Sequence, residues 1–392
     1  MKKVLWLASW YPNAAEPFSG DFIKRQAEAV SIFQPLTILF VGKYLSPHHS
    51  GAVTPDIRSN ESGSIEENIL YYSSPGNGNT KFPKIRSLYT YFKKHAEFIK
   101  RLRKSDELPD LVHVQVAMKA GLVALYMKWK YKIPYVITEH WSGYFEGTKD
   151  SLFQKSHLTR YLTRLILKNA ARLLPVSDSL GTQIRNRWTN IPFQKIPNVV
   201  NTRYFYPMVS QPEGSFRFIH ISTLLYPKNP EGIIRSFSSL LSQGFQANLV
   251  LVGPLNPSIQ EMIQSTGLHK DKIHCTGEIS YEQVGAELRK SSALVMFSFY
   301  ETMSCVVIEA LCSGIPVIAT RVGGIPEVVG NENGILINAG NETELLQAMK
   351  EMISTYQEYK KENISRQASA QFSYETIGRK ITQVYDEVIK KG

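Results

Sequence analysis

Two patterns of apolar and polar residues alternate along the first half of the chain. Short apolar runs are typical of buried strands, and longer segments with apolar residues every three or four positions are typical of helices. The predicted strands are 4–9, 36–41, 69–72, 112–116, 135–138 and 173–176. The predicted helices are 21–32, 85–104, 119–130, 152–171 and 179–188. This alternation predicts a mostly parallel sheet covered by helices on both faces.

The same alternation restarts after residue 215. The predicted strands here are 216–222, 249–252, 273–275, 294–297, 317–319 and 335–337. The predicted helices are 230–243, 259–266, 281–290, 305–312 and 342–354. Between the halves, the segment 197–207 and the polar run 210–215 are typical of a linker. We therefore predict two α/β domains, residues 1–205 and 206–373, and a C-terminal helix within 374–392.

The apolar runs and the cysteines indicate the cellular compartment. No apolar run reaches the roughly 18 residues needed to span a bilayer. The apolar run at the N-terminus ends at the polar Ser9, so we interpret it as a first strand and not as a signal peptide. The three cysteines, Cys275, Cys305 and Cys312, lack metal-binding spacing. We therefore expect a cytoplasmic, reducing environment.

The positive charge is concentrated in one segment. The whole chain has a net charge of +11, and residues 81–172 hold 19 Lys+Arg against 7 Asp+Glu. A solvated basic surface explains this, and so does attraction to an anionic acceptor or to the inner face of an anionic membrane. The amphipathic segment 85–104 favours a core contact over a membrane anchor. The chain has no zinc-finger spacing and no RNP-type motif, so we expect no nucleic-acid partner.

The stretch 297–329 contains the most informative chemistry. Glu301 follows a predicted strand, and Glu309 lies eight residues later inside a predicted helix that starts near Cys305. The free N–H groups at such a helix start bind phosphate well. Glu309 could then accept hydrogen bonds from ribose hydroxyls, and Glu301 could hold a sugar hydroxyl. The alternative is an ordinary strand–helix–strand unit with two surface glutamates.

This stretch resembles the E-x7-E signature of retaining glycosyltransferase family 4, whose members have the GT-B fold. Glu301 and Glu309 occupy the two glutamate positions. Ala310, Gly314, Pro316, Gly323, Gly324, Pro326 and Glu327 also match. The resemblance implies two Rossmann-like parallel-sheet domains facing across a cleft, with a C-terminal helix that crosses back to the first domain.

The start of the second domain carries a second match and one departure. Lys228 matches the family's lysine, which neutralises the donor diphosphate. Ser222 and Thr223 stand where the family usually has Gly-Arg. Thr223 could donate one neutral hydrogen bond, which is weaker than a charge-assisted one. Either another cation fills in, or the phosphates rest more on Lys228 and on backbone amides.

Further matches extend the resemblance over most of the chain. In the loop after the first strand, Gly20 resembles the glycine whose backbone approaches the donor phosphates. This loop is not G-x-G-x-x-G, so we expect no nicotinamide cofactor. His140 matches a histidine that faces the donor sugar. The loops at Gly253 and Ile279 resemble those lining the nucleoside pocket, although plain turn chemistry also explains them.

These matches predict a specific set of site residues. The expected catalytic residues are His140, Lys228 and Glu301. The expected donor-binding residues are Gly20, Thr223, Lys228, Gly253, Ile279, Glu301, Met303, Ser304, Cys305 and Glu309. We find no D-x-D motif and no metal-ligand spacing, so we expect no metal site and no cofactor. The donor enters as a substrate, and the choice between a UDP- and a GDP-linked sugar stays open.

The sequence thus predicts a retaining, metal-independent glycosyltransferase of the hexosyltransferase type. It would move a sugar from a nucleotide-sugar to the hydroxyl of a glycan or lipid-linked acceptor, in the assembly of cell-surface polysaccharide or glycolipid. One alternative is another enzyme on this scaffold, such as a nucleotide-sugar epimerase. The other is a degenerate, non-catalytic protein that binds sugar nucleotides.

Overall fold

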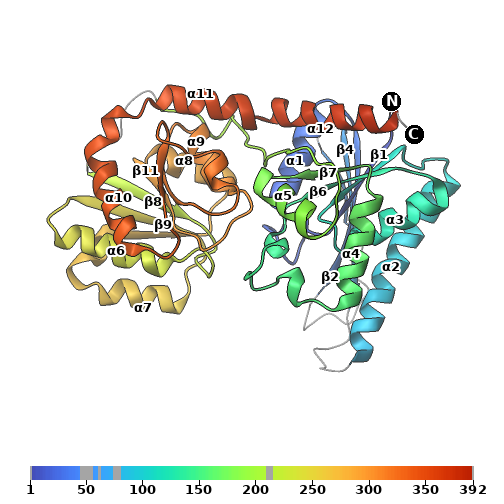
Figure 1. Ribbon diagram of the computed structural model, residues 1–392, viewed down its shortest axis with the longest axis horizontal. Coiled ribbons are helices and arrows are strands. Elements are labelled where there is room, and N and C mark those ends of the chain that lie inside the picture. The colour runs from blue at the N-terminus through green and yellow to red at the C-terminus, as the bar shows by residue number, and fades with distance from the viewer. Residues whose placement is uncertain (1, 45–55, 61–62, 74–80, 209–214, 391–392) are drawn as a thin grey trace. The chain divides into compact units, whose positions relative to one another are not determined.

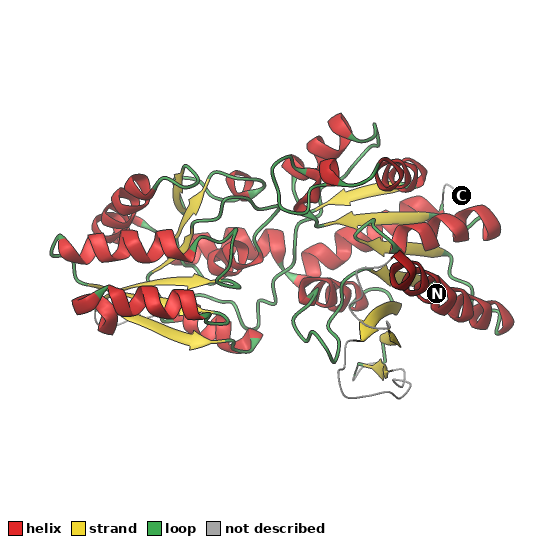
Figure 2. Ribbon diagram, turned by 90° about the horizontal axis from the view of Figure 1, so that it is seen from below, coloured by secondary structure: helices red, strands yellow, loops and turns green. Residues whose placement is uncertain are grey.

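The computed structural model describes residues 2–44, 56–60, 63–73, 81–208 and 215–390 (Figure 1). The chain forms two compact units. Unit 1 comprises Met1–Val176, Leu180–Pro197 and Tyr374–Gly392, and unit 2 comprises Ser177–Ser179 and Asn198–Ser373. Each unit contains one sheet with helices packed around it (Figure 2). The predicted α/β class with two parallel-sheet domains is confirmed.

Unit 1 contains a sheet in the order β3-β4-β2-β1-β5-β6-β7. Its strands are β1 (Val4–Ala8), β2 (Leu36–Tyr44), β3 (Asp56–Ser59), β4 (Ile65–Ser73), β5 (Leu111–Gln115), β6 (Tyr135–Glu139) and β7 (Arg172–Pro175). All neighbouring pairs are parallel except β3 with β4. The central strands β1, β5 and β6 are buried along their whole length, as parallel strands covered on both faces must be.

The helices of unit 1 are α1 (Asp21–Ser31), α2 (Lys81–Lys104), α3 (Ala120–Tyr131), α4 (His157–Asn169), α5 (Asp178–Arg187) and α12 (Tyr374–Ile389). The connection from β1 through α1 to β2 runs toward one edge of the sheet, whereas those through α2, α3 and α4 run toward the other edge. Because such crossovers are right-handed, α1 lies on one face of the sheet and α2, α3 and α4 lie on the opposite face.

The C-terminal helix α12 packs against α1. A Cβ atom added at Gly378 of α12 would lie 2.1 Å from the carbonyl oxygen of Ala29 in α1, so only glycine allows this approach. Further along α12, the Tyr385 hydroxyl accepts a hydrogen bond from the Trp6 indole N–H at 3.0 Å and lies 2.6 Å from Nδ1 of His113. All three side chains are buried, and Nε2 of His113 lies 2.7 Å from the Thr138 hydroxyl, so their polar atoms have partners.

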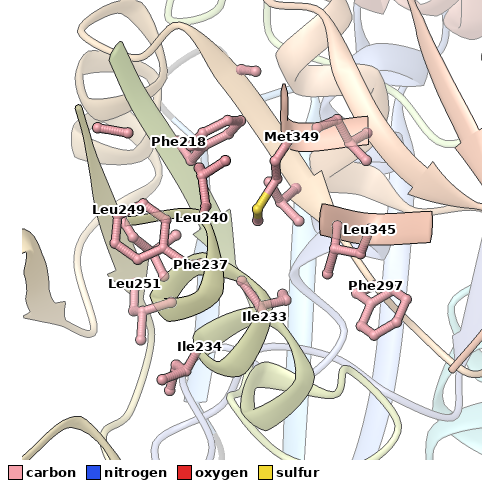
Figure 3. Close-up of a cluster of buried hydrophobic side chains, with 14 of the residues drawn as sticks. Phe218, Ile233, Ile234, Phe237, Leu240, Leu249, Leu251, Phe297, Leu345 and Met349 are labelled. Carbon is pink, nitrogen blue, oxygen red and sulfur yellow. The ribbon is translucent and has the colours of Figure 1, made fainter. Parts of the chain in front are cut away.

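Unit 2 contains an all-parallel sheet in the order β10-β9-β8-β11-β12-β13. Its strands are β8 (Phe216–Ile221), β9 (Ala247–Val252), β10 (Ile273–Gly277), β11 (Ala293–Met296), β12 (Val317–Thr320) and β13 (Gly334–Ile337). Its helices are α6 (Pro230–Ser242), α7 (Pro257–Ser265), α8 (Tyr281–Arg289), α9 (Cys305–Cys312), α10 (Glu342–Thr355) and α11 (Lys361–Phe372). Figure 3 shows its core, where side chains of α6 and α10 such as Phe237 and Met349 pack on Phe218 and Leu249 of the sheet.

The structure differs from the sequence prediction at several elements. The edge strand β3 was not predicted, because its four residues are mostly exposed and form no apolar run. Helix α11 was also not predicted, since only one narrow stripe of it is buried. The predicted helix 152–171 consists of a short 3-10 turn and α4, because the Ser156 hydroxyl caps α4 by accepting from the Thr159 N–H.

The boundary between the two units along the chain lies before the predicted residue. The prediction started the second domain at residue 206, whereas residues 198–205 belong to unit 2. The Asn198 amide donates to the Met303 carbonyl at 3.0 Å, and the Val200 N–H donates to the Phe372 carbonyl at 2.8 Å. These bonds hold the segment on unit 2. The predicted linker residues 210–214 lie outside the described residues.

Among the described helices, none is both long enough and apolar enough to cross a bilayer.

Buried neutral histidines make the stability of the fold depend on pH. Burial lowers the pKa of His95 to about 4 and that of His113 to about 3, and it lowers the pKa of His220 in unit 2 to about 4. Below about pH 6.5 the unfolded chain binds protons at these histidines and the folded chain does not. The free energy of unfolding should therefore fall as the pH drops from 6.5 toward 4.

The contribution of one histidine can be isolated with His95→Leu. This substitution removes one proton from the linkage, so it should reduce the pH dependence by up to about 1.4 kcal/mol per pH unit in that window. Urea unfolding at several pH values measures the slope. His157→Leu, at an exposed histidine, is the matched control and should keep the wild-type slope. Parallel curves for wild type and His95→Leu would contradict the linkage.

Candidate active site

After β8 and after β11, at the carboxyl edge of the sheet in unit 2, the chain crosses to opposite faces of the sheet. β8 connects through α6 to β9 on one side, and β11 pairs with β8 on its other side. Open α/β sheets bind ligands at such a switch point. Lys228 lies in the loop after β8, and Glu301 lies in the loop after β11. The Phe299 N–H donates to the Pro227 carbonyl at 2.8 Å and fastens the two loops together.

Lys228 and Glu301 meet directly in this structure. The Lys228 ammonium lies 2.5 Å from Oε1 of Glu301, and the Ser298 hydroxyl donates to the same oxygen at 2.9 Å. The Glu301 side chain is 8% exposed and that of Lys228 is 25% exposed. A carboxylate removed from water this far needs a cation or hydrogen-bond donors. The pair thus places a compensated negative charge and one cation side by side at the switch point.

Helix α9 begins just beyond Glu301. Ser304 is its N-cap, and the Ser304 hydroxyl accepts from the Val307 N–H. Cys305 is the first helical residue and is half-buried, and Met303 before the cap is buried. The N-terminus of a helix carries a partial positive charge and is therefore suited to an anion. Glu309 lies one turn further into α9 and is 3% exposed.

Two glycines allow the loops of this edge to pack closely. Gly323 has φ +54°, and a Cβ there would lie 1.7 Å from the carbonyl oxygen of Glu301. Gly253 has φ +141°, and a Cβ there would lie 1.9 Å from the carbonyl oxygen of Ser222. Any larger residue would displace the Glu301 loop or the end of β8. The two glycines therefore allow the backbone at Glu301 and at Ser222 to approach the neighbouring loops.

The Ser-Thr pair that replaces the expected Gly-Arg has a local structural role. The Ser222 hydroxyl lies 2.8 Å from Nε2 of His220 and accepts from the Leu224 N–H at 2.9 Å. Nδ1 of His220 lies 2.8 Å from the Val295 carbonyl, so this network ties β8 to β11. Thr223 is exposed at the same edge. Arg321, which follows β12, has its guanidinium 3.5 Å from the Leu336 carbonyl.

The remaining predicted residue of unit 2 lies on the other side of β8. Ile279 is half-buried and precedes Ser280, which caps α8 in a capping box with Gln283. The Gly253 N–H donates to the Gly277 carbonyl at 3.0 Å, so the loops after β9 and β10 lie together. Gly253 and Ile279 therefore belong to adjacent loops.

In unit 1, Gly20 and His140 both lie at the carboxyl edge of the sheet. Gly20 caps α1 with φ +68°, and a Cβ there would lie 2.6 Å from the backbone of Trp10. Asp21 is the first helical residue. The Phe22 ring lies 4.7 Å from the His140 ring, so the start of α1 contacts the end of β6.

A buried carboxylate anchors the backbone at His140. The Glu139 carboxylate accepts hydrogen bonds from the N–H groups of Ala117, His140 and Trp141 and from the Tyr144 hydroxyl, all at 3.0–3.1 Å. Burial raises the pKa of the Glu139 carboxyl, and these four donors act in the opposite direction. The ring of His140 has a second anchor, since its Nε2 lies 3.3 Å from Oε1 of Gln115.

The sequence prediction missed the residues that hold the site residues in place. Ser298, Gln115 and Glu139 are all polar residues at the ends of buried strands, which is a signal that could have identified them. Among the described residues, no group of three or more His, Cys, Asp or Glu is gathered as a metal site would require.

Two protein-family models match this chain. The model described as Glycosyltransferase Family 4 matches residues 56–204, and the one described as Glycosyl transferases group 1 matches residues 208–371. The two matches together span most of the chain and follow one another along it.

The individual relatives share less than a third of their residues with this chain. The glycosyltransferase MJ1178 of Methanocaldococcus jannaschii is 28% identical over 55% of this chain and 56% of its own length. The alpha-monoglucosyldiacylglycerol synthase of Streptococcus pneumoniae is 22% identical over 60% of this chain and 56% of its own length. TuaC of Bacillus subtilis, a glycosyltransferase assigned to teichuronic acid biosynthesis, is 25% identical over 82% of this chain and 81% of its own length. The chain thus matches just over half the length of the first two relatives.

Solved structures share the fold over the full chain. Sucrose-phosphate synthase from Thermosynechococcus elongatus has a TM-score of 0.79 at 19% identity and covers 100% of both chains. HepE from Anabaena, solved with UDP, has a TM-score of 0.73 at 16% identity and covers 98% of this chain and 100% of its own. These likenesses show the fold, and the two family models, which together span most of the chain, show that it belongs to the glycosyltransferases of group 1 and family 4.

Proposed function

We propose that this protein transfers a hexosyl group from a nucleotide-diphosphate sugar to an acceptor hydroxyl, with retention at the anomeric carbon and without a metal ion. The observation that carries the proposal is the Lys228–Glu301 pair beside the start of α9. One cation, one buried carboxylate and the N-terminus of a helix match a ligand that has both phosphate and hydroxyl groups. HepE, which shares the fold, was solved with UDP, which supports a nucleotide-linked donor.

Each group has a proposed role in this reaction. Lys228 and the first turn of α9 bind the donor diphosphate and stabilise its charge as it departs. Glu301 accepts hydrogen bonds from the sugar hydroxyls, and Glu309 accepts them from the ribose. His140 contacts the donor sugar, and the backbone at Gly20 approaches the phosphates. Thr223, Gly253, Ile279, Met303, Ser304 and Cys305 complete the proposed donor-binding set.

Retention requires an attack from the face that the leaving group occupies, or a covalent intermediate. A same-face displacement fits these residues, because Glu301 and Glu309 both have hydrogen-bonding roles in the proposal and neither serves as a nucleophile. In this route the departing phosphate oxygen takes the proton of the acceptor hydroxyl as the new glycosidic bond forms. The diphosphate thus serves as leaving group and as base.

We propose a glycan or lipid-linked acceptor in cell-surface assembly, met at an anionic membrane. Two similar proteins are named for teichuronic acid biosynthesis and for a diacylglycerol glycolipid. Helices α3 and α4 of unit 1 contain no Asp or Glu. Their outer surface exposes Tyr126, Trp129, Lys130, Tyr161, Arg164 and Lys168, which we call the basic aromatic face.

The two helices of this face are neighbours. The Lys128 ammonium at the end of α3 donates to the Asn169 carbonyl at the end of α4 at 2.6 Å. Trp129 is 55% exposed and Tyr161 is 61% exposed. Aromatic rings among cations suit the region of lipid headgroups, where the rings enter the interface and the cations meet anionic lipid.

Donor binding can be tested with a thermal-shift panel of nucleotide diphosphates and nucleotide-sugars in the presence of EDTA. A ligand of the folded state raises the melting temperature, since 100 times Kd adds about 2.7 kcal/mol. We expect a shift for one base, unaffected by EDTA and lost in Glu309→Ala. Glu351→Ala, at an exposed glutamate of α10, should respond as wild type does. A shift that EDTA abolishes would contradict the metal-independent proposal, and no shift with any compound would favour a degenerate protein.

Membrane attachment can be tested by flotation with vesicles that contain or lack anionic lipid. Lys130→Glu combined with Lys168→Glu should reduce recovery with anionic vesicles by about tenfold or more, because each cation near the surface contributes about 1 kcal/mol. The control variant is Lys360→Glu with Lys380→Glu, which makes the same change of charge at two other exposed lysines. Lys360 lies just before α11, and Lys380 lies on α12. Equal recovery of wild type with both kinds of vesicle would refute the attachment.

A further inference from the structure

Gln115 is a buried polar residue at the carboxyl end of β5. It is 0% exposed and pairs in register with Thr138 of β6, two residues before His140. Its amide oxygen lies 3.3 Å from Nε2 of His140, and its amide nitrogen donates to Oε1 of Gln26 in α1 at 3.4 Å. The side chain thus bridges α1 and the loop that carries His140.

This contact determines which nitrogen of His140 carries the proton. A carboxamide oxygen can only accept a hydrogen bond, so Nε2 of His140 must be the donor. A neutral imidazole has one N–H, so Nδ1 then holds the lone pair. The partner of one ring nitrogen therefore decides which hydrogen-bonding role the other nitrogen takes.

The environment of His140 separates the anchoring of its backbone from that of its ring. Glu139 binds the backbone N–H of His140, as described above. The ring meets Gln115 and, at 4.7 Å, the ring of Phe22. The Gln115 contact is a hydrogen bond to one particular ring nitrogen, whereas the Phe22 contact involves the whole ring.

Among the contacts of His140 described above, the charged group is Glu139, whose carboxylate is already bound by four donors. On β5, burial lowers the pKa of His113 to about 3, so this ring is neutral. On α1, Phe22 and Gln26 are uncharged. Tyr144, which donates to Glu139, has a pKa raised by burial and is also neutral. A charge introduced at Gln115 would therefore act strongly on the neighbouring imidazole.

We propose that Gln115 is a positioning residue of the transferase, whose amide oxygen holds the His140 imidazole in its Nε2–H tautomer and in a fixed orientation. The proposal rests on the proposed function, in which His140 contacts the donor sugar. Gln115 thus selects which role, hydrogen-bond donor or acceptor, His140 presents to the sugar.

The tautomer can be read directly by long-range 1H–15N NMR on protein labelled with 15N-histidine, with the His140 signal assigned by its loss in His140→Gln. Wild type should show the Nε2–H pattern. Gln115→Met, which keeps the volume and lacks the acceptor, should give a mixture of both tautomers. An Nδ1–H pattern in wild type, or an unchanged Nε2–H pattern in folded Gln115→Met, would overturn the proposal.

A second variant changes the charge and keeps the acceptor. Gln115→Glu should move the titration midpoint of His140 upward by about one pH unit or more, because a nearby carboxylate favours the imidazolium. Gln34→Met is the matched control, since Gln34 is also buried and donates to the Lys2 and Pro35 carbonyls at the amino edge of the same sheet. It should lower stability and leave the His140 signals unchanged. A His140 midpoint that does not move in Gln115→Glu would count against the contact.

Activity provides the third readout and separates the two proposals. Gln115→Met should lower kcat by about tenfold or more with little change in the KM for the donor, as expected when a contacting group loses its orientation. Gln34→Met should keep the wild-type kcat. If wild type transfers no sugar from any donor, the proposed function fails, whereas the NMR result still decides whether Gln115 sets the tautomer.

Discussion

The direction in which the chain leaves the central strand of each sheet is the constraint on which the remaining structure depends. From β8 the chain crosses to β9 on one side, and β11 is later added on the other side. Right-handed crossovers in opposite directions place their helices on opposite faces, so the carboxyl ends of β8 and β11 form a switch point of the kind where open sheets bind ligands. Lys228 and Glu301 lie in the loops after these two strands. β1, with β2 on one side and β5 on the other, repeats the arrangement in unit 1 and places Gly20 and Gln115 in the corresponding positions.

Buried polar groups fix the side chains at these edges at a cost in desolvation. The Glu139 carboxylate is fully buried, and an uncompensated charge there would cost several kcal/mol. Its four donors offset this cost and in return fix the backbone from Ala117 to Tyr144. The His220–Ser222 pair does the same for the end of β8 with neutral groups. Rigid site residues therefore depend on neighbours that are themselves fully hydrogen-bonded.

The alternation of apolar runs was sufficient to predict most strands and helices, and α9 and α12 begin where predicted, because buried parallel strands and amphipathic helices carry a strong local signal. β3 and α11 lack that signal. The motif around Glu301 located the charged residues, since their spacing is local. The bonds from Ser298 to Glu301 and from Gln115 to His140 could not be predicted, because the latter joins separate strands and neither follows from residue type alone. The site residues themselves remain predictions.

In the proposed donor site, the absence of the family's arginine changes how a phosphate would be recognised. Before a ligand binds, the charge of Lys228 is balanced by Glu301, so the pair offers a phosphate no net charge. The start of α9 contributes an equivalent of about half a positive charge. A diphosphate that draws Lys228 away leaves Glu301 with the Ser298 hydroxyl as its remaining partner among these contacts, in a position that is 8% exposed. The hydroxyl groups of a donor sugar can replace the lost ammonium, whereas a nucleotide without a sugar cannot. The ion pair would then favour the intact nucleotide-sugar over the free nucleotide, because only the former compensates both charges.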